Sequence, residues 1–209
     1  MQSIANFLAE NHLSLLDIGG TFVGLFYIYY QFRVSWKLWV ASLVMSLFYI
    51  ALNIQGELYA LAGIYVYYSL AAVWGLWQWK MKGVESEEGG AVSHMPRRLY
   101  PRVLGVIAIL TGLLAVVLHL LHEDSTLWGD AFTSATSIVA MWILAKKYCQ
   151  HWLFWIVVDG VNCALYAYLG AGYVFSSCLF GLYAVVSVFG YLYWRKQVVP
   201  QGEAAHLSA

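Results

Sequence analysis

One stretch in the last third of the chain places aromatic, acidic and amide side chains at helical spacing. Its members follow one another in steps of three and four residues: Trp152, Trp155, Asp159, Asn162 and Tyr166. Such steps put side chains on one face of an α-helix. Indole and phenol rings stack on planar groups and attract cations, and a carboxylate attracts cations as well. The face is therefore suited to binding a small, planar, positively charged ligand.

The acidic member of this face lies inside an apolar run. Asp159 is about 10 Å along the helix axis from Trp152, at about 1.5 Å per residue. A carboxylate in a bilayer is costly unless it faces a partner, a cavity or a ligand. No Lys or Arg lies at that depth in the sequence. Asp159 is then either protonated and hydrogen-bonded, or ionised, facing water and receiving a cation; we favour the second state.

Other apolar runs carry further candidate ligand contacts in their middle parts: Tyr65, Tyr68, Thr133 and Tyr183. Each has a structural alternative, because tyrosines pack in cores and hydroxyls often bond their own helix backbone. His119 and His122 lack a third ligand for a metal ion, and the cysteines match no metal or redox spacing. We expect no catalytic residue, no metal and no cofactor.

The composition is that of a membrane protein. Of the 209 residues, 62% are hydrophobic and only 11% are charged, whereas a soluble domain has roughly a quarter charged residues. The net charge is zero, so nothing indicates nucleic acid as a partner. Seven apolar segments approach the length of about 20 residues that a spanning helix needs. They run Leu15–Phe32, Leu38–Ile54, Tyr59–Trp79, Val103–Leu121, Ala131–Ala145, Trp152–Leu169 and Tyr173–Trp194.

The basic residues predict the topology. All eleven Lys and Arg fall in alternate connections, within 33–37, 80–102, 146–147 and 195–196. Positive charge marks the cytoplasmic side of a membrane protein. Seven helices then place the N-terminus outside, and the C-terminus, with a tail at 197–209, in the cytoplasm. The polar segment 80–102 is expected to be a flexible cytoplasmic linker.

The chain also carries a weak internal repeat. Trp36–Trp39 resembles Trp152–Trp155, and Gly75–Lys80 resembles Gly190–Arg195, with about 115 residues between the members of each pair. The alternative explanation is that aromatic and basic residues collect at membrane interfaces in any case.

A repeat of this kind predicts an all-α membrane protein of seven helices in a 3+1+3 arrangement. Two parallel three-helix repeats, 1–79 and 130–196, would be joined by a connecting helix at 103–121. Parallel repeats occur in transporters, where the substrate site lies between the two halves.

Motifs along the whole chain resemble the PnuC family of bacterial vitamin transporters. They are Leu58-Tyr59, Gly75…Trp79, Ser137–Met141, Lys146-Lys147-Tyr148, Trp152-x-x-Trp155-x-x-x-Asp159 and Gly190…Trp194. The resemblance implies a fold like that of the SWEET sugar transporters, and facilitated diffusion of a vitamin across the bacterial inner membrane. It also implies trapping of the vitamin by a cytoplasmic kinase, and a homotrimer.

The substrate is predicted from departures within that resemblance. The family's nicotinamide riboside branch usually has Asn where this chain has Asp159, and tends to have Gln near Tyr65. These departures favour thiamine, whose aminopyrimidine donates hydrogen bonds and whose thiazolium is a cation. Nicotinamide riboside, also a cation, is the alternative, and riboflavin and deoxynucleosides stay open.

Two other classes of protein fit less well. A seven-helix receptor without transport would need an output domain, and only a short tail follows Lys196. An intramembrane enzyme would need a catalytic partner at the depth of Asp159, and none is evident. We therefore expect a transporter and not an enzyme.

Overall fold

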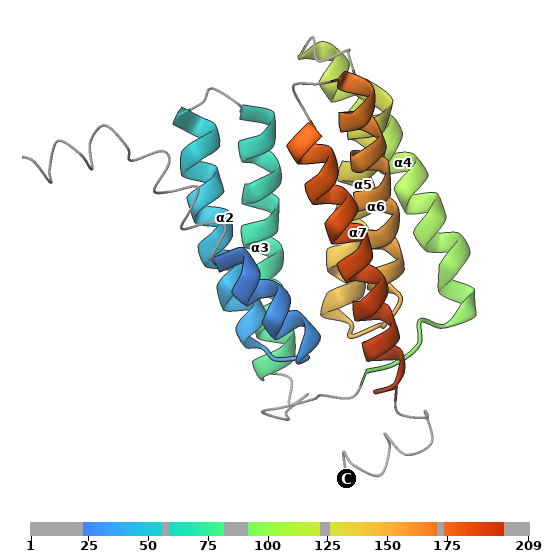
Figure 1. The fold of residues 1–209 in the computed structure, drawn as a ribbon. Helices are drawn as coiled ribbons and strands as arrows, with labels where there is room; N and C mark the ends of the chain where they lie inside the picture. The colour runs from blue at the N-terminus through green and yellow to red at the C-terminus, as the bar shows by residue number, and fades with distance from the viewer. Residues whose placement is uncertain (1–22, 56–58, 82–91, 122–125, 171–173, 199–209) are drawn as a thin grey trace, which may run out of the picture. The chain divides into compact units, whose positions relative to one another are not determined.

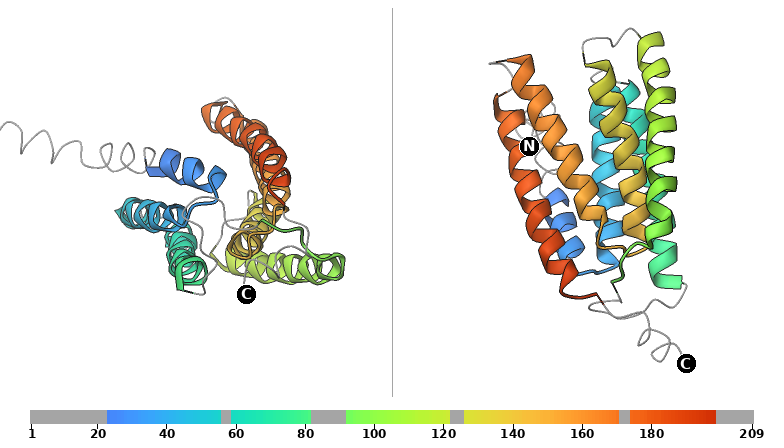
Figure 2. Two further views of the ribbon diagram at one scale, coloured as in Figure 1. Left: turned by 90° about the horizontal axis from the view of Figure 1, so that it is seen from below. Right: turned by 90° about the vertical axis from the view of Figure 1, so that its right-hand side faces the viewer.

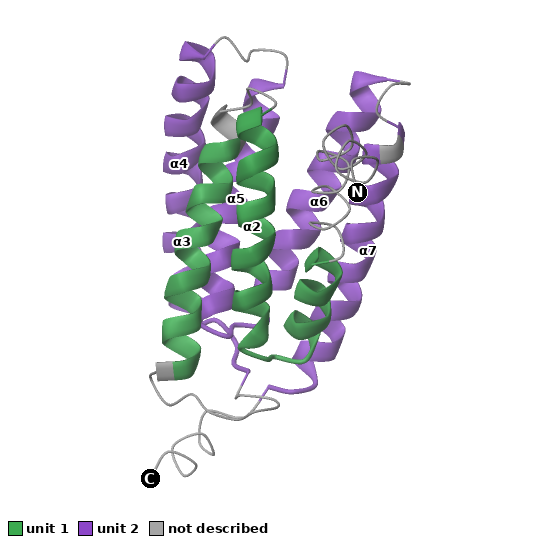
Figure 3. Cartoon of the chain, turned by 90° about the vertical axis from the view of Figure 1, so that its left-hand side faces the viewer, with its two compact units in different colours: residues 1–90 green, residues 91–209 purple. Residues whose placement is uncertain are grey.

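The computed structural model describes a helical protein divided into two compact units, residues 1–90 and 91–209 (Figure 3). The residues that it describes are 23–55, 59–81, 92–121, 126–170 and 174–198. Predictions for residues 15–22, for the start of the last helix at Tyr173 and for most of the tail lie outside this part of the chain.

The first unit contains a helix at residues 23–32, followed by α2 (Lys37–Gln55) and α3 (Tyr59–Met81) (Figure 1). The helix α2 packs against α3. The predicted first helix is thus helical from residue 23 to its predicted end at Phe32.

The second unit contains the short 3-10 helix η1 (Arg97–Leu99) and then α4 (Tyr100–Leu120), α5 (Leu127–Ala145), α6 (His151–Leu169) and α7 (Val174–Arg195). Packing links these helices in chain order, because α5 packs against both α4 and α6, and α6 packs against α7. The helices α6 and α7 lie side by side in Figure 1 and in both views of Figure 2.

Two helices of this unit begin earlier than predicted. The helix α4 begins at Tyr100 rather than Val103, and α5 begins at Leu127 rather than Ala131. Pro101 lies in the first turn of α4, where a missing N–H costs nothing and the fixed φ suits the helix. The 3-10 turn η1 leads directly into it.

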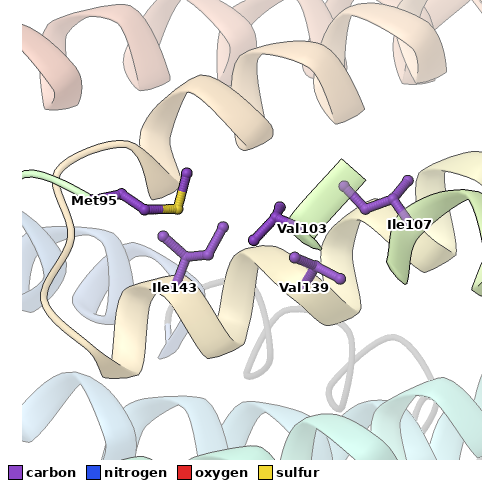
Figure 4. Packing of buried hydrophobic residues seen from close by; sticks show 5 residues of the cluster. All are labelled: Met95, Val103, Ile107, Val139 and Ile143. Carbon is purple, nitrogen blue, oxygen red and sulfur yellow. The ribbon is translucent and has the colours of Figure 1, made fainter. Parts of the chain in front are cut away.

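Within the described residues, five helices are long and apolar enough to cross a membrane: Lys37–Gln55, Arg97–Leu120, Leu127–Ala145, His151–Leu169 and Ser176–Arg195. The helix α4 is apolar on its exposed sides as well as on its buried side. Val103 and Ile107 are buried with Val139, Ile143 and Met95 in one cluster (Figure 4). Most of the other large apolar side chains of α4 are exposed. A helix that is apolar on all sides suits a membrane.

The turns before α2 and α6 have the same backbone. Val34 and Lys147 lie 113 positions apart, and they are the non-glycine residues with positive φ in the described chain, at 53° and 56°. In both turns the following residue donates its N–H to the carbonyl five positions earlier, at 3.0 and 3.2 Å. Positive φ is a true outlier for a β-branched residue such as Val34. The same unusual turn at both places supports an internal repeat.

A second match joins the last two helices of each unit. Its members are Trp39, Gly75 and Trp79 in the first unit and Trp152, Gly190 and Trp194 in the second. In each unit the first indole lies directly against the glycine of the next helix. It also meets the second indole edge-on, with ring centroids 5.5 Å apart in the first unit and 6.2 Å in the second. Only a residue without a Cβ allows so close an approach.

These contacts correct the predicted register of the repeat. The motif Trp36–Trp39 predicts that Trp36 corresponds to Trp152, but Trp39 is the residue that makes the contacts of Trp152. The motif spacing was misleading because Trp36 and Trp39 are both tryptophans, and only their contacts distinguish them.

Residues 92–95 form a strap across the turn between α5 and α6. Ser93 donates its N–H to the carbonyl of Lys147 at 3.1 Å and accepts from the N–H of Cys149 at 3.0 Å. The N–H of Met95 donates to Oε1 of Gln150 at 2.8 Å. The predicted linker 80–102 is therefore structured from residue 92 onwards.

The Gln150 amide also contacts a histidine of the strap. Its Nε2 lies 2.9 Å from Nδ1 of His94. The two ends of one amide thus reach two residues of the strap, Met95 and His94. The sulfur of Cys149 lies 3.3 Å from the same Nδ1, so His94 ties the strap to two residues of the turn.

We expect Gln150→Ala to loosen the strap and expose Cys149. This thiol is fully buried, and burial raises its pKa to about 11, so the reactive thiolate is scarce. In proteins whose other two cysteines are alanine, Gln150→Ala should speed alkylation of Cys149 by iodoacetamide about tenfold, because local opening limits the reaction. Gln78→Ala, in the other unit, is the control. Equal rates for Gln150→Ala and its parent would show that Gln150 does not hold the strap.

Candidate functional site

The predicted face of α6 packs against a matching face of α7. The matching residues repeat the same steps of three and four: Phe180, Tyr183, Ser187, Gly190 and Trp194. Three contacts join the two faces in order. Trp152 lies on Gly190 and Trp194, Asp159 accepts a hydrogen bond from Ser187, and Tyr166 stacks on Phe180.

Asp159 is the acidic centre of the face and is buried, with 6% of its surface exposed. The hydroxyl of Ser187, itself 4% exposed, donates to Oδ2 of Asp159 at 3.3 Å. Ser187 was not predicted as a site residue. Its signal was available, because it occupies the same helical spacing on α7 that identified Asp159 on α6.

The predicted α6 residues fall into two groups. Trp152 and Tyr166 are held by rings of α7, with Tyr166 stacked on Phe180 at 5.4 Å and 6° between ring planes. Trp155 and Asn162 flank Asp159 by one turn on either side. Among the described residues, Nε1 of Trp155 is buried without a hydrogen-bond partner, and the half-buried side chain of Asn162 makes no hydrogen bond.

The predicted tyrosines take part in aromatic clusters, one in each unit. In the first unit, Tyr65 stacks on Tyr49 at 4.9 Å and meets Tyr68 edge-on at 5.8 Å and 81°. In the second unit, Phe180 meets Tyr183 edge-on at 6.2 Å and 88°. Phe180 and Tyr183 lie 115 positions after Tyr65 and Tyr68, so this pair also fits the repeat.

Thr133 has a local partner. It is buried in α5, and its hydroxyl donates to the carbonyl of Asp130 at 3.3 Å. The Asp130 carboxylate accepts from Thr126 just before the helix. Both interactions favour the structural interpretation of these residues.

Together, three neighbouring side chains offer complementary hydrogen-bonding groups. Asp159 supplies acceptor oxygens, Trp155 supplies an N–H donor, and the Asn162 amide supplies both. This set suits a neutral or cationic ring whose edge carries an N–H beside a carbonyl. In the described part of the chain, no three His, Cys, Asp or Glu side chains are grouped so as to hold a metal ion.

Comparison with known proteins identifies the family. A family model described as nicotinamide mononucleotide transporter matches residues 14–196. The chain belongs to this family. The match extends over both units, so the family assignment applies to nearly the whole sequence.

The relatives of this protein are named for two different vitamins. The riboflavin/roseoflavin transporter RibM of Streptomyces davaonensis is 27% identical over 197 residues, covering 93% of this chain and 91% of the relative. The nicotinamide riboside transporter PnuC of Haemophilus influenzae is 24% identical, covering 95% and 79%. The predicted resemblance to the PnuC family is confirmed.

A solved structure shares the fold. The crystal structure of the vitamin B3 transporter PnuC matches with a TM-score of 0.70 at 22% identity, covering 93% of this chain and 86% of that one. The relatives and the apolar helices identify the chain as a multi-pass protein of the bacterial inner membrane.

Proposed function

We propose that this protein carries a flat, nitrogen-containing vitamin across the bacterial inner membrane by facilitated diffusion, with nicotinamide riboside as the first candidate. The observation that carries this proposal is the set of Trp155, Asp159 and Asn162 on one face of α6. The carboxamide of nicotinamide riboside has an N–H and a carbonyl side by side, and its pyridinium ring is a cation that a carboxylate attracts.

The preference for thiamine that the sequence suggested is revised. The relatives described above are named for nicotinamide riboside or riboflavin, and neither name supports thiamine. Riboflavin is the second candidate, because RibM matches nearly the whole chain and because the flavin imide places an N–H between two carbonyls. Thiamine, which has an amino group beside a ring nitrogen, comes third.

We also propose the 3+1+3 arrangement, with α4 connecting two parallel repeats, the N-terminus outside and the C-terminus in the cytoplasm. The matched turns, the matched Trp–Gly contacts and the basic residues in alternate connections support it. A homotrimer and a cytoplasmic kinase that phosphorylates the vitamin are proposals from the family resemblance.

Binding to the purified full-length protein tests the cargo. We expect calorimetric titration with nicotinamide riboside to give saturable binding, and proteoliposomes to exchange labelled nicotinamide riboside for unlabelled. Titrations with riboflavin and thiamine are run beside it. Tighter binding of either compound would replace nicotinamide riboside as the cargo, and binding of a cargo without exchange would contradict transport.

A further inference from the structure

Resting on the transport function proposed above, we infer that Ser187 is a positioning residue for Asp159 and thereby sets a preference for cargo whose ring edge donates an N–H hydrogen bond. In this role Ser187 does not touch the cargo. Its hydroxyl holds one carboxylate oxygen of Asp159, which leaves the other oxygen to accept a hydrogen bond from the cargo.

The contact between the two side chains joins two helices inside the second unit. Oγ of Ser187 on α7 donates to Oδ2 of Asp159 on α6 at 3.3 Å, and both residues are more than nine-tenths buried. Among the described residues, neither side chain makes another hydrogen bond. A carboxylate held by one donor loses much of its freedom to rotate, so its remaining acceptor atom keeps a fixed direction.

The hydroxyl of Ser187 is used differently from those of comparable residues. A serine or threonine inside a helix commonly donates to the carbonyl four positions earlier in its own helix. Ser69 donates to Tyr65 in this way at 3.1 Å, and Thr136 donates to Phe132 at 2.7 Å. Ser187 instead donates its hydrogen bond to a side chain of the neighbouring helix, that of Asp159.

The first unit shows the same helix packing without the Asp159–Ser187 pair. In the matched registers, Ser46 lies 113 positions before Asp159, and Ala72 lies 115 positions before Ser187. Both are buried. The first unit therefore packs two matching helices, with the same Trp–Gly contact, without an acid and its hydroxyl donor. Packing does not require the Asp159–Ser187 pair, which points to a role in recognition.

The test measures how Ser187→Ala changes selectivity between two ligands. The probes are nicotinamide riboside and 3-acetylpyridine riboside, which keeps the cation and the carbonyl but replaces the amide NH2 by a methyl group. We expect Ser187→Ala to weaken binding of nicotinamide riboside about fivefold to tenfold, since the Asp159 oxygen that accepts from the cargo amide is then no longer held in one direction. Binding of the acetyl analogue should change less than about twofold.

Three further variants separate positioning from packing. Ser177→Ala removes another α7 hydroxyl that reaches α6, where it donates to the carbonyl of Cys163 at 2.9 Å, and it should leave selectivity unchanged. Ser187→Thr keeps the hydroxyl and should restore the preference. In an Asp159→Asn background, Ser187→Ala should have little further effect, because the two residues act as a unit. Equal weakening of both ligands by Ser187→Ala would overturn the inference.

A ligand-free measurement keeps the inference testable if the proposed cargo is wrong. Infrared spectra of the full-length protein, compared with those of Asp159→Asn, identify the carboxyl band of Asp159. We expect Ser187→Ala to shift that band, and Ser177→Ala to leave it in place. An unshifted band would overturn the inference. Absence of binding by the unaltered protein would instead contradict the proposed function.

Discussion

Asp159→Asn is expected to lower the affinity for nicotinamide riboside by at least about tenfold. The substitution keeps the shape of the side chain but removes its charge and one acceptor oxygen. A hydrogen bond to a charged group contributes about 1.5–3 kcal/mol, and each 1.4 kcal/mol is about a factor of ten in affinity. Calorimetric titration of the purified variant measures the loss. Riboflavin carries no positive charge, so its binding should fall less.

The control for this substitution is Asp130→Asn. Asp130 lies in the first turn of α5, where Thr126 bonds its carboxylate, so its neutralisation should not change binding. Thermal unfolding in detergent is measured for both variants. Removing a buried charge should not destabilise Asp159→Asn. If Asp159→Asn binds as tightly as the unaltered protein, then Asp159 is not part of the site.

Gly190→Ala and Gly75→Ala are expected to destabilise the protein by about 1–3 kcal/mol each, as overpacking does. A Cβ at Gly190 would lie 2.5 Å from the ring of Trp152, and one at Gly75 would lie 2.4 Å from the ring of Trp39. Neither ring has room to withdraw, because each also packs edge-on against a second indole. The midpoint of thermal unfolding in detergent measures the effect.

Each of these glycines has a matched control in its own helix. A Cβ at Gly63 of α3 would meet nothing within 4 Å, and one at Gly181 of α7 would only touch the sulfur of Cys163 at 3.5 Å. Alanine at either control should be neutral or should stabilise by up to about 1 kcal/mol, since alanine favours the helix more than glycine does. Equal losses at tested and control positions would mean that the indole contacts do not limit stability.

Helix positions and the polar face of α6 were predictable from the sequence, because both depend on a repeating order of apolar and polar residues. The partner face on α7 was predictable in principle by the same rule. The strap was not, since it depends on backbone groups of Ser93 and on the Gln150 side chain. Such contacts leave no periodic pattern in the sequence, and the polar residues before Pro96 are typical of a linker.

The sequence alone does not select one substrate. The charge of Asp159 does not separate one vitamin from another, because selectivity depends on where donors and acceptors point. Contacts between side chains of different helices, such as the hydrogen bond from Ser187 to Asp159, join residues distant in the sequence and leave no pattern in it. The register of the repeat failed for the same reason, since Trp36 and Trp39 differ in their contacts and not in their type.

The paired turns at Val34 and Lys147 bear on how such a protein changes over generations. One turn carries an apolar side chain and the other a basic one, yet both keep the same backbone. The backbone of the turn therefore does not depend on one kind of side chain, since an apolar residue and a basic residue both adopt it. The two halves can therefore differ in the side chains at these turns while α2 and α6 are entered by the same backbone.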